Sequence, residues 1–465
     1  MTTDRPKIAE LPYPADSAVL FETLAHLPWA VFLDSGYPAI RQGRYDILAA
    51  EPWLTLTTSG EITEIRGADG VELSGEDPFL LLRRYLGEPA EGVAGLPFGG
   101  GAIGYFAYDL GRRIERLPAL ARDDIQLPEM AVGLYDWAVV VDHVERCCWL
   151  VGQGRDGRTF ERWEALLKRL TDPEPQQRVR QPFRVLSKVR SNMDRAYYAR
   201  AFDRIEHYIR EGDCYQVNFA QRFSARAEGD PWLAYRRLRV MNPAPFAAYV
   251  ATPYGTILSA SPERFLRVRD GRVETKPIKG TRPRSSDPAR DRALAEELLR
   301  SPKDRAENLM IVDLLRNDLG KNCAIGSVKV PKLFALESFA TVHHLVSTIA
   351  GELAPDRHAL DLLRGCFPGG SITGAPKLRA MEIIEELEPH RRGVYCGSIG
   401  YIGFDGAMDT NVAIRTLLHA GKAVHFYAGG GIVADSRMEE EYQETFDKAA
   451  ALLRLLEQGE MRQCG

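Results

Sequence analysis

Ser261-Pro-Glu-Arg-Phe-Leu-Arg-Val-Arg-Asp-Gly-Arg-Val-Glu-Thr-Lys-Pro-Ile-Lys-Gly-Thr-Arg282 contains a predicted β-hairpin near the middle of the chain. Residues 265–269 and 272–275 have the alternation of apolar and polar side chains that is typical of strands. Asp270-Gly271 lies between them, and Asp-Gly flanked by such runs is a strong signal for a two-residue hairpin turn. We therefore expect two antiparallel strands joined at Asp270-Gly271.

This hairpin would bring a carboxyl and an amine together at its open end. In the ideal register Glu263 falls opposite Ile278, one position from Lys279. Neighbouring residues of a strand face opposite sides, so Glu263 and Lys279 share a face only if the register shifts by one. Pro277 favours such an irregularity because proline interrupts a strand ladder. The pair is either an exposed ion pair, which is common and weak, or part of a functional site.

Composition indicates a globular protein without a strong charge bias. The 465 residues are enough for two or three domains, and the formal net charge of −4 provides no overall basic field for nucleic acid. The seven cysteines form no C-x-x-C pair, so neither a disulfide framework nor a zinc site is indicated. The first residues lack the apolar core of a signal peptide, and no apolar run is long enough to span a bilayer. We expect a cytoplasmic protein whose partners include neither nucleic acid nor a membrane.

The chain divides at a proline-rich segment. Residues 11–150 contain many short apolar runs between turn residues, as in a region built from strands. Residues 172–186 include three prolines and few apolar side chains, which is typical of a linker. Residues 187–456 form the second region, which begins with an amphipathic helix that Asp194 is expected to cap.

Two polar residues interrupt an apolar strand predicted over residues 214–220. Gln216 and Asn218 lie on the same face of that strand because side chains alternate. A buried polar side chain needs a hydrogen-bond partner. The two residues therefore either face a ligand or bond to the backbone.

A helix predicted over residues 304–318 carries a glutamate on its apolar side. Glu307 projects between Ile311 and Leu314, and a buried carboxylate is costly unless it is paired or binds a metal. No cation lies on that face of the helix itself. This favours a ligand role for Glu307 over a simple ion pair.

The last helix, predicted from about Met438, carries a charged stripe. Glu441, Glu444 and Lys448 follow a spacing of three and four, at the border of the apolar face. The stripe is either a solvated surface or part of a site. Glu307 together with Glu444 would provide only oxygen ligands. Mg²⁺ typically binds a few protein carboxylates and completes its coordination shell with water or substrate oxygens.

Two further segments bear on a binding site. Three consecutive glycines at residues 429–431 are expected to form a loop whose N–H groups can face a carboxylate or a phosphate. His343 and His344 are adjacent on a predicted strand. Alternation sends them to opposite faces, so the two histidines cannot both line one site.

Eight motifs, in this order, resemble those of the chorismate-utilising enzymes: Ser261–Phe265, Pro277–Arg282, Asp313–Asp318 on the helix of Glu307, His344–Ser347, Gly374–Met381, Ala413–Arg415, Gly429–Val433 and Glu441–Thr445. The similarity covers residues 187–456, and residues 11–150 resemble the N-terminal region of the family's synthase components. The resemblance implies an α+β fold: a sandwich of two large antiparallel β-sheets with outer helices and a central active-site cleft.

Two positions distinguish branches within this family. Members that add water to chorismate carry a lysine base where this chain has Gln216, and members that form anthranilate carry alanine where it has Lys279. Lys279 matches the branch that forms 4-amino-4-deoxychorismate, whereas Arg282 is more typical of the anthranilate branch. The resemblance thus implies amination of chorismate at C4, toward p-aminobenzoate and folate. Formation of anthranilate is one alternative, and a non-catalytic regulator that binds chorismate or tryptophan is an alternative of a different class.

The resemblance also implies roles for individual residues. Lys279 would be a covalent nucleophile, and Glu263 the general acid and base at the departing C4 hydroxyl. Glu307 and Glu444, supported by Glu441, would hold Mg²⁺ as the cofactor. The residues implied to bind the substrate are Gln216, Thr281, His344, Thr373, Tyr395, Arg415, Gly429, Gly430, Gly431 and Lys448.

Partners follow from the same resemblance. The chain shows no Cys-His-Glu amidotransferase arrangement, so ammonia would come from a separate glutamine amidotransferase subunit or from ammonium in solution. Residues 27–36 and 44–48 resemble a region that holds tryptophan in relatives. Tryptophan bound there would be either regulatory or structural.

Overall fold

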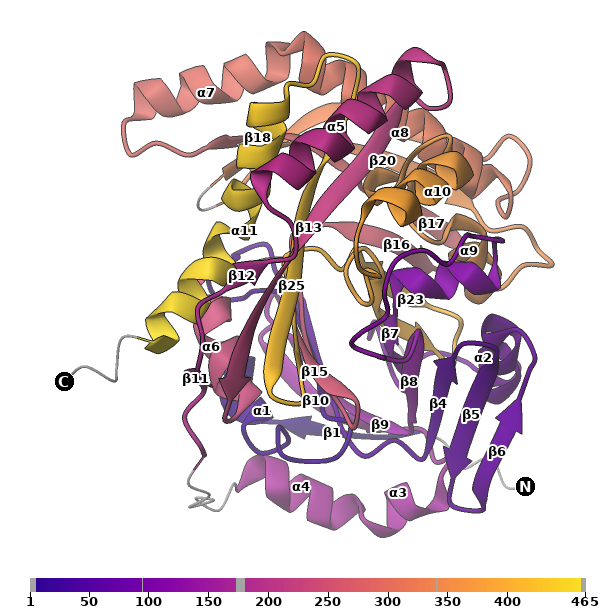
Figure 1. The fold of residues 1–465 in the computed structure, drawn as a ribbon. Helices are drawn as coiled ribbons and strands as arrows, with labels where there is room; N and C mark the ends of the chain where they lie inside the picture. The colour runs from indigo at the N-terminus through magenta and orange to yellow at the C-terminus, as the bar shows by residue number, and fades with distance from the viewer. Residues whose placement is uncertain (1–5, 94, 173–179, 340–341, 461–465) are drawn as a thin grey trace.

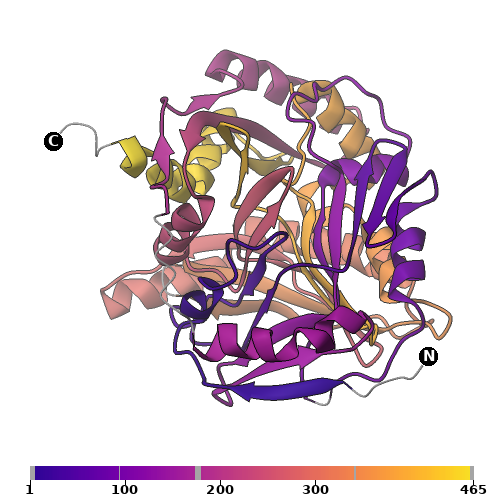
Figure 2. The ribbon, with the colours of Figure 1, turned by 90° about the horizontal axis from the view of Figure 1, so that it is seen from below.

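Two large antiparallel β-sheets form the centre of the molecule, and helices lie outside them (Figure 1, Figure 2). A computed structural model describes residues 6–93, 95–172, 180–339 and 342–460 of the chain. The α+β sandwich expected from the sequence is confirmed by this arrangement.

The strands of each sheet run antiparallel to their neighbours in the described residues. The first sheet has thirteen strands, in the order β1 (Lys7–Leu11), β10 (Cys147–Gly152), β9 (Trp137–Asp142), β3 (Tyr45–Ala49), β2 (Val31–Asp34), β14 (Phe246–Thr252), β15 (Gly255–Ser261), β24 (Thr416–Ala420), β25 (Ala423–Ile432), β13 (Gln216–Glu228) and β11 (Arg184–Val185), with β12 (Arg190–Ser191) and β21 (Gly374–Ala375) also on β13. The second has twelve, in the order β18 (Ile278–Pro283), β20 (Val342–Glu352), β17 (Arg272–Thr275), β16 (Arg264–Arg269), β23 (Met408–Asn411), β22 (Ser398–Gly403), β7 (Gly101–Phe106), β8 (Met130–Tyr135), β4 (Leu54–Ser59), β5 (Ile62–Gly67) and β6 (Gly70–Ser74), with β19 (Lys329–Ser338) on β20.

The helices connect and cover these strands. They are α1 (Ser17–Phe21), α2 (Pro78–Leu86), α3 (Gly157–Glu161), α4 (Trp163–Thr171), α5 (Arg195–Arg210), α6 (Pro231–Met241), α7 (Pro288–Arg300), α8 (Pro302–Gly320), α9 (Ala359–Cys366), α10 (Lys377–Leu387) and α11 (Met438–Glu460), with 3-10 turns η1 (Tyr108–Arg113) and η2 (Gly370–Ile372). Asp194 caps α5 as predicted, because its carboxylate accepts the N–H of Tyr197 at 2.7 Å.

Apolar clusters fill the space between the sheets and on their outer sides. Val31 and Val250 of the first sheet pack with Ile103 and Ile399 of the second, and all four are buried. A second cluster joins the first sheet to α1, α4, α6 and α11. A third joins the other sheet to α2, α8, α9 and α10. The helices therefore stay outside because their apolar faces bury the outer sides of the sheets.

Strands from both halves of the sequence share each sheet. β2 pairs with β14 in the first sheet, and β7 pairs with β22 in the second. Early and late segments therefore lie side by side, as the colours of Figure 1 show. Residues 173–179 of the predicted linker lie outside the described residues, and Arg184–Val185 at its end form β11. The division of the sequence at this linker stays a prediction.

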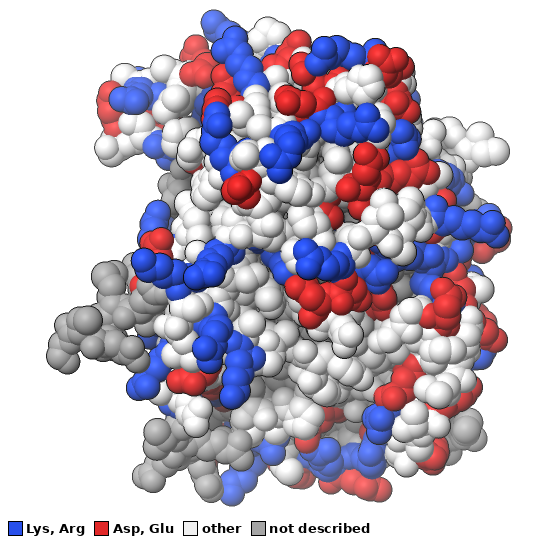
Figure 3. All heavy atoms as spheres, viewed as in Figure 1, with Lys and Arg blue, Asp and Glu red and all other residues white. Residues whose placement is uncertain are grey.

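The surface is polar and of mixed charge on the face seen in Figure 3. Lysine and arginine lie there among aspartate and glutamate, including in a band across the middle of the face, with uncharged areas above and below that band. The formal net charge of −4 agrees with this balance. None of the described helices is both long and apolar enough to cross a membrane.

The hairpin predicted at Asp270-Gly271 is confirmed. β16 and β17 pair with Arg269 opposite Arg272. Asp270 and Gly271 have φ angles of 51° and 71°, as a type I′ turn requires.

The pairing predicted at the open end of this hairpin does not form, although the β16–β17 ladder has the predicted register. The β16–β17 ladder ends with Arg267 opposite Glu274, before Pro277, which has no N–H to extend it. β18 instead pairs with β20, where Thr281 lies opposite His344. Lys279 therefore belongs to a different ladder from Glu263.

The glycine run forms a strand and not the predicted loop. Residues 429–431 belong to β25 and lie opposite residues 218–220 of β13. A Cβ on Gly429 would lie 2.3 Å from the carbonyl oxygen of Phe219. Glycine is needed here because the two backbones approach too closely for a side chain.

Candidate active site

Glu263 and Lys279 converge although they come from different ladders. Glu263 lies between β15 and β16, and Lys279 lies on β18. The N–H of Ile278 donates to the Glu263 side chain, and the Lys279 ammonium is close enough to lower the pKa of that carboxyl. The carboxyl and the amine thus lie near enough for their charges to interact, without an ion pair between them among the described residues, and Lys279 reaches this position through the β18–β20 ladder.

The Glu263 carboxyl is buried and held by a hydroxyl. Only 6% of Glu263 is exposed, and Ser371 Oγ donates to its Oε1 at 2.9 Å. Burial raises the pKa of Glu263 to about 7, although Ser371 and Lys279 act to lower it. A carboxyl with a pKa near neutrality can both give and take a proton, as a general acid and base must.

The surroundings of Lys279 favour a neutral amine. Burial lowers the pKa of the Lys279 ammonium, and the positive charge of Lys448 lowers it further. The carboxylate of Glu307 opposes this change without cancelling it. A lysine whose pKa is lowered has a larger share of the neutral form, which is the nucleophile.

Two glutamates of α11 converge on the glycine strand. A Cβ on Gly430 would lie 3.0 Å from Glu441 Oε2 and 3.2 Å from Glu444 Oε1. Glu441 is buried, and its Oε2 has no hydrogen-bond partner among the described residues. Burial raises the pKa of Glu441, whereas Lys448 brings the pKa of Glu444 below its usual value against the effect of burial. The absent side chain of Gly430 makes room for both carboxylates.

The predicted environment of Glu307 needs a correction. Sequence reasoning found no cation on its helix face, but Lys279 of β18 and Lys303 of the same helix both act to lower its pKa. Burial is the larger effect and leaves the pKa of Glu307 raised. The cations were missed because one comes from another strand and the other from the first turn of α8.

The three glutamates fit a divalent cation that keeps other ligands. Within the described ranges, no three His, Cys, Asp or Glu side chains are arranged as ligands of one metal ion. A buried carboxylate oxygen without a donor, such as Glu441 Oε2, nevertheless needs a counter-charge. Mg²⁺ commonly binds one or two carboxylates and completes its shell with water or substrate oxygens. Glu441 and Glu444, with Glu307 nearby, match that donor set.

Two residues of β13 direct their N–H groups away from the glycine strand. Asn218 N donates to Thr373 O at 2.8 Å, and Ala220 N donates to Glu388 Oε1 at 2.9 Å. Neither residue therefore bonds to β25. In an antiparallel ladder the residues opposite such positions also point their N–H and C=O groups away.

Gly431 and Gly429 are the residues opposite Asn218 and Ala220. Their N–H groups thus lie on the open edge of β25, where Lys448 Nζ donates to Gly429 O at 3.0 Å. Gly430 lies opposite Phe219 and faces the ladder. The strand therefore presents two N–H groups to an anionic ligand, and not the three expected from a loop.

Arg415 provides a cation without a protein counter-ion. Its guanidinium forms no ion pair or hydrogen bond within the described part of the chain, and burial lowers its pKa. Its φ of 50° lies in the left-handed region, and such strained residues cluster at ligand sites. A half-buried cation without an anionic partner fits an anionic ligand.

His344 lies beside Arg415. His343 and His344 were expected to face opposite sides of their strand, so that only one of them could belong to a site. His344 Nδ1 is 2.8 Å from Thr281 Oγ1, and burial together with Arg415 lowers the His344 pKa to about 4. His344 is therefore neutral at physiological pH. His343 instead bonds to Asp291 of α7 at 3.1 Å, so only His344 belongs to this site.

Gln216 and Asn218 differ in the way they are satisfied. Asn218 Nδ2 donates to Ile372 O at 2.9 Å, so its side chain bonds to the backbone. Gln216 is fully buried, and neither of its amide atoms has a partner in the described residues. Its amide lies 3.0–3.3 Å from the position of a Cβ on Gly431. The interpretation that Gln216 faces a ligand therefore stays open.

Thr373, a further predicted substrate-binding residue, has its hydroxyl engaged within the chain. Thr373 Oγ1 donates a hydrogen bond to Gly369 O at 3.0 Å, inside the turn that precedes β21.

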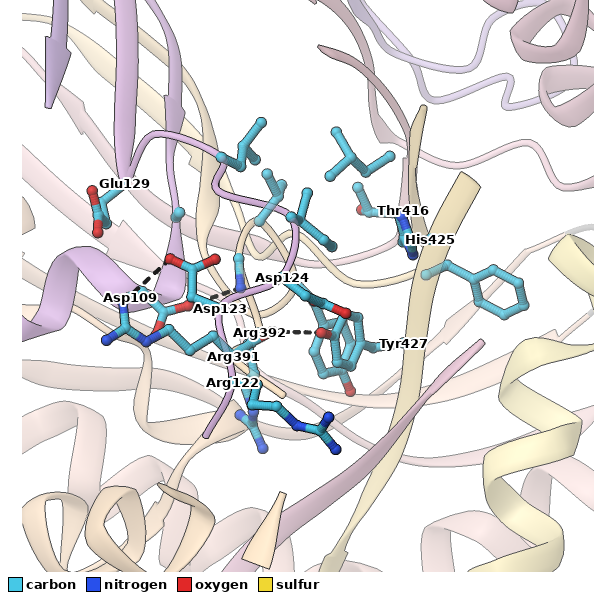
Figure 4. A pocket seen from close by; sticks show the side chains of 18 residues that line it. Asp109, Arg122, Asp123, Asp124, Glu129, Arg391, Arg392, Thr416, His425 and Tyr427 are labelled. Carbon is cyan, nitrogen blue, oxygen red and sulfur yellow. Dashed lines mark hydrogen bonds and ion pairs between the residues drawn. The ribbon is translucent and has the colours of Figure 1, made fainter. Parts of the chain in front are cut away.

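Tyr395 lines a cavity together with Tyr427, which Figure 4 labels. Tyr395 stacks on Tyr427 with ring centroids 5.2 Å apart, and both rings line this cavity, whose volume is about 30 Å³. The Tyr427 hydroxyl donates to Arg391 O at 2.5 Å, which fixes the pair. Glu263 and Lys279 do not line the cavity, so Tyr395 is the predicted site residue that borders it.

Two residues of the site were not predicted from the sequence. Lys303 acts on the pKa values of Glu307, Glu441 and Glu444, and its position one turn before Glu307 was a usable signal. Ser371 had no such signal, because 108 positions separate it from Glu263.

The chain is similar to known proteins over nearly its whole length. A sequence model of the family described as chorismate binding enzyme matches residues 43–454. The chain is 50% identical over 461 residues to aminodeoxychorismate synthase component 1 of Salmonella typhimurium, covering 98% of this chain and 100% of that one. It is 42% identical over 425 residues to anthranilate synthase component 1 of Thermus thermophilus, covering 90% of each chain.

A solved structure shares the fold. Anthranilate synthase component I from Streptococcus pneumoniae superposes with a TM-score of 0.80 at 33% identity, over 89% of this chain and 93% of that one. The family interpretation drawn from the eight motifs is thereby confirmed. With a family match over most of its residues and relatives at up to 50% identity, this chain belongs to the chorismate-binding enzyme family.

Proposed function

We propose that this chain aminates chorismate at C4 to form 4-amino-4-deoxychorismate, on the route to p-aminobenzoate and folate. The observation that carries the proposal is the Lys279 amine beside Glu263, with the pKa of the lysine lowered and that of the carboxyl raised to about 7. The 50% identical relative named aminodeoxychorismate synthase component 1 supports the same reaction.

The first half of the reaction uses Lys279 as the nucleophile. Its neutral Nζ bonds to C2 of chorismate, the ring double bond shifts, and the bond between C4 and its oxygen breaks. Glu263 gives its proton to the departing hydroxyl, which leaves as water. Covalent catalysis replaces one difficult displacement with two easier ones.

The second half returns both residues to their starting states. Ammonia bonds to C4, the double bond shifts back, and the bond between C2 and Nζ breaks. Lys279 leaves as a neutral amine, because the adduct had kept its protons as a secondary ammonium. The Glu263 carboxylate takes the extra proton of the new ammonium group and is ready for the next cycle.

The other site residues would bind the two carboxylates of chorismate. Glu307, Glu441 and Glu444 would hold Mg²⁺, which supplies positive charge for the ring carboxylate. Arg415 would bind the second carboxylate, together with Tyr395 and the N–H groups of the glycine strand. The unpaired Arg415 guanidinium and the open edge of β25 support this division.

Ammonia would come from a second protein. The relatives carry the words component 1 in their names, and we expect this chain to work with a glutamine amidotransferase subunit. Ammonium in solution would replace that subunit in the assay.

The N-terminal region is a candidate tryptophan site. The two segments that resemble a tryptophan-binding region are adjacent in the structure, because β2 pairs with β3. Ser35 donates to Asp46 Oδ1 through both its N–H and its hydroxyl, each at 2.7 Å. Calorimetric titration with tryptophan tests this proposal, and wild-type protein that releases no heat would remove it.

Formation of anthranilate is the second candidate. Arg282 and the 42% identical anthranilate synthase component 1 favour it. Arg282, however, pairs with Glu297 of α7 at 2.8 Å and with Asp304 of α8 at 3.1 Å. Its guanidinium is thus engaged with two helices, which leaves Lys279 as the distinguishing residue.

The test is product analysis with purified protein, chorismate, ammonium and Mg²⁺. Chromatography separates 4-amino-4-deoxychorismate from anthranilate, and a lyase converts the former to p-aminobenzoate. The first product supports the proposal, and anthranilate supports the second candidate. No product, either with ammonium or with glutamine and the amidotransferase subunit, would exclude both and leave a regulator.

A further inference from the structure

We propose that Ser371 is a positioning residue for the general acid. Its hydroxyl, together with the N–H of Ile278, would hold the Glu263 carboxyl in one orientation toward the departing C4 hydroxyl. This inference rests on the proposed function, because it needs Glu263 to transfer a proton.

The contact between Ser371 and Glu263 is short and excluded from water. Ser371 Oγ lies 2.9 Å from Glu263 Oε1, and the two residues are 8% and 6% exposed. The backbone of Glu263 is held as well, because its N–H donates to Ser261 Oγ at 3.2 Å. A hydrogen bond in such a poorly solvated place is stronger than one in water and restricts the carboxyl to few orientations.

The turn that carries Ser371 is itself fixed. Ser371 is the central residue of η2, and Ile372 O accepts hydrogen bonds from Asn218 Nδ2 and Arg392 Nη1, both at 2.9 Å. On the other side, Thr373 Oγ1 donates to Gly369 O at 3.0 Å. Ser371 therefore stands on a clamped turn, which is what a residue that orients a catalytic group requires.

The remaining groups that face Glu263 do not supply an equivalent contact. Lys279 of β18 and Lys448 of α11 lower its pKa through their charges, and the buried Cys396 lies close enough to interact with it. Each acts at longer range, whereas the Ser371 hydroxyl donates a hydrogen bond to a defined oxygen of Glu263. Donation to the carboxylate favours its ionised form, so loss of Ser371 must raise the Glu263 pKa.

The test compares pH profiles of kcat/KM for wild-type protein, Ser371→Cys and Ser371→Thr. Glu263 acts as an acid, so activity falls as pH rises through its pKa. A thiol is a weak donor, so Ser371→Cys should move that fall to higher pH and lower kcat/KM about 10- to 100-fold through loss of orientation. Ser371→Thr keeps a hydroxyl and should restore the wild-type position of the fall.

A matched control separates positioning from general loss of packing. Ser398 is also buried, but its hydroxyl donates to Asn411 O at 2.6 Å and not to the Glu263 carboxyl, so Ser398→Ala should leave the pH profile in place. If wild-type protein forms 4-amino-4-deoxychorismate and Ser371→Cys has an unmoved profile, the role of Ser371 is excluded while the proposed function stands. If wild-type protein forms no such product, the proposed function fails first, and Ser371 has no acid to position.

Discussion

Lys448 joins the last helix to the glycine strand through Gly429. Its Nζ donates to Gly429 O at 3.0 Å and also pairs with Glu444 Oε1 at 2.5 Å. One ammonium thus lies between a backbone carbonyl and a predicted metal ligand, and its charge lowers the pKa of Lys279 as well.

Lys448→Met removes this charge, and activity should then need a higher pH. Without the nearby cation the Lys279 pKa rises toward its ordinary value, so less neutral amine is present at a given pH. The rise of kcat/KM on the acidic side should therefore move to higher pH. Lys422→Met, at an exposed lysine, is the control and should leave the profile unchanged. An unmoved profile in Lys448→Met would show that Lys448 does not tune the nucleophile.

Lys279→Ala should abolish both turnover and a covalent adduct. We expect the rate with ammonium to fall by more than about 100-fold, which is about 2.7 kcal/mol of barrier. In wild-type protein given chorismate without ammonia, intact-protein mass spectrometry should detect an adduct of chorismate minus water. Lys276→Ala is the control, because Lys276 pairs with Glu337 on the same segment. An adduct that persists in Lys279→Ala would place the nucleophile elsewhere.

Glu263→Gln should lose activity and change the pH dependence of stability. Loss of the general acid lowers kcat by about 10²- to 10⁴-fold. The folded-state pKa of about 7 lies above the unfolded value, so the wild-type chain loses stability as pH rises from about 4.5 to about 7. The loss is on the order of 3 kcal/mol.

Glutamine does not titrate, so the stability of Glu263→Gln should lack this fall. The free energy of unfolding of the variant minus that of wild type should therefore increase as pH rises from pH 4 to pH 8. Urea unfolding at the two pH values measures the difference. If the difference in the free energy of unfolding were the same at both pH values, the pKa of Glu263 would not be raised in the folded chain.

Local signals predicted much of this fold. The Asp270-Gly271 hairpin and the Asp194 cap were predicted correctly, because the residues that determine them are neighbours in sequence. The helix predicted over residues 304–318 is α8, which starts two residues earlier, at Pro302. α7 was not predicted, although the Asp287 cap, Pro288 in the first turn and the spacing of four between Leu294 and Leu298 were usable helix signals.

Contacts between distant segments set the rest of the site. The pairing of β18 with β20 joins Thr281 to His344, 63 positions away, and no turn signal specifies it. The glycines of residues 429–431 suggested a loop, because glycine is rare in strands unless another backbone comes close. That close approach belongs to β13, more than two hundred residues earlier, so it is visible only in the structure.

Arg392→Met should destabilise the chain strongly. Arg392 is buried and bonds to both oxygens of the buried Glu388, at 2.6 and 2.9 Å. Removal of the guanidinium leaves an unpaired buried carboxylate, which typically costs 3–5 kcal/mol. Urea unfolding should show this loss, whereas Arg437→Met, at an exposed ion pair with Glu440, should change stability by less than about 1 kcal/mol. Equal effects of the two variants would contradict the structural role given to Arg392.

Gly430→Ala should weaken the use of Mg²⁺. The new Cβ would lie 3.0 Å from Glu441 Oε2 and 3.2 Å from Glu444 Oε1, so one or both carboxylates must move. Because the cation needs its ligand oxygens at defined positions, the Mg²⁺ concentration required for half-maximal activity should rise. Gly157→Ala is the control, since a Cβ there meets no atom within 4 Å. The same Mg²⁺ dependence in Gly430→Ala and wild type would place the metal away from this part of β25.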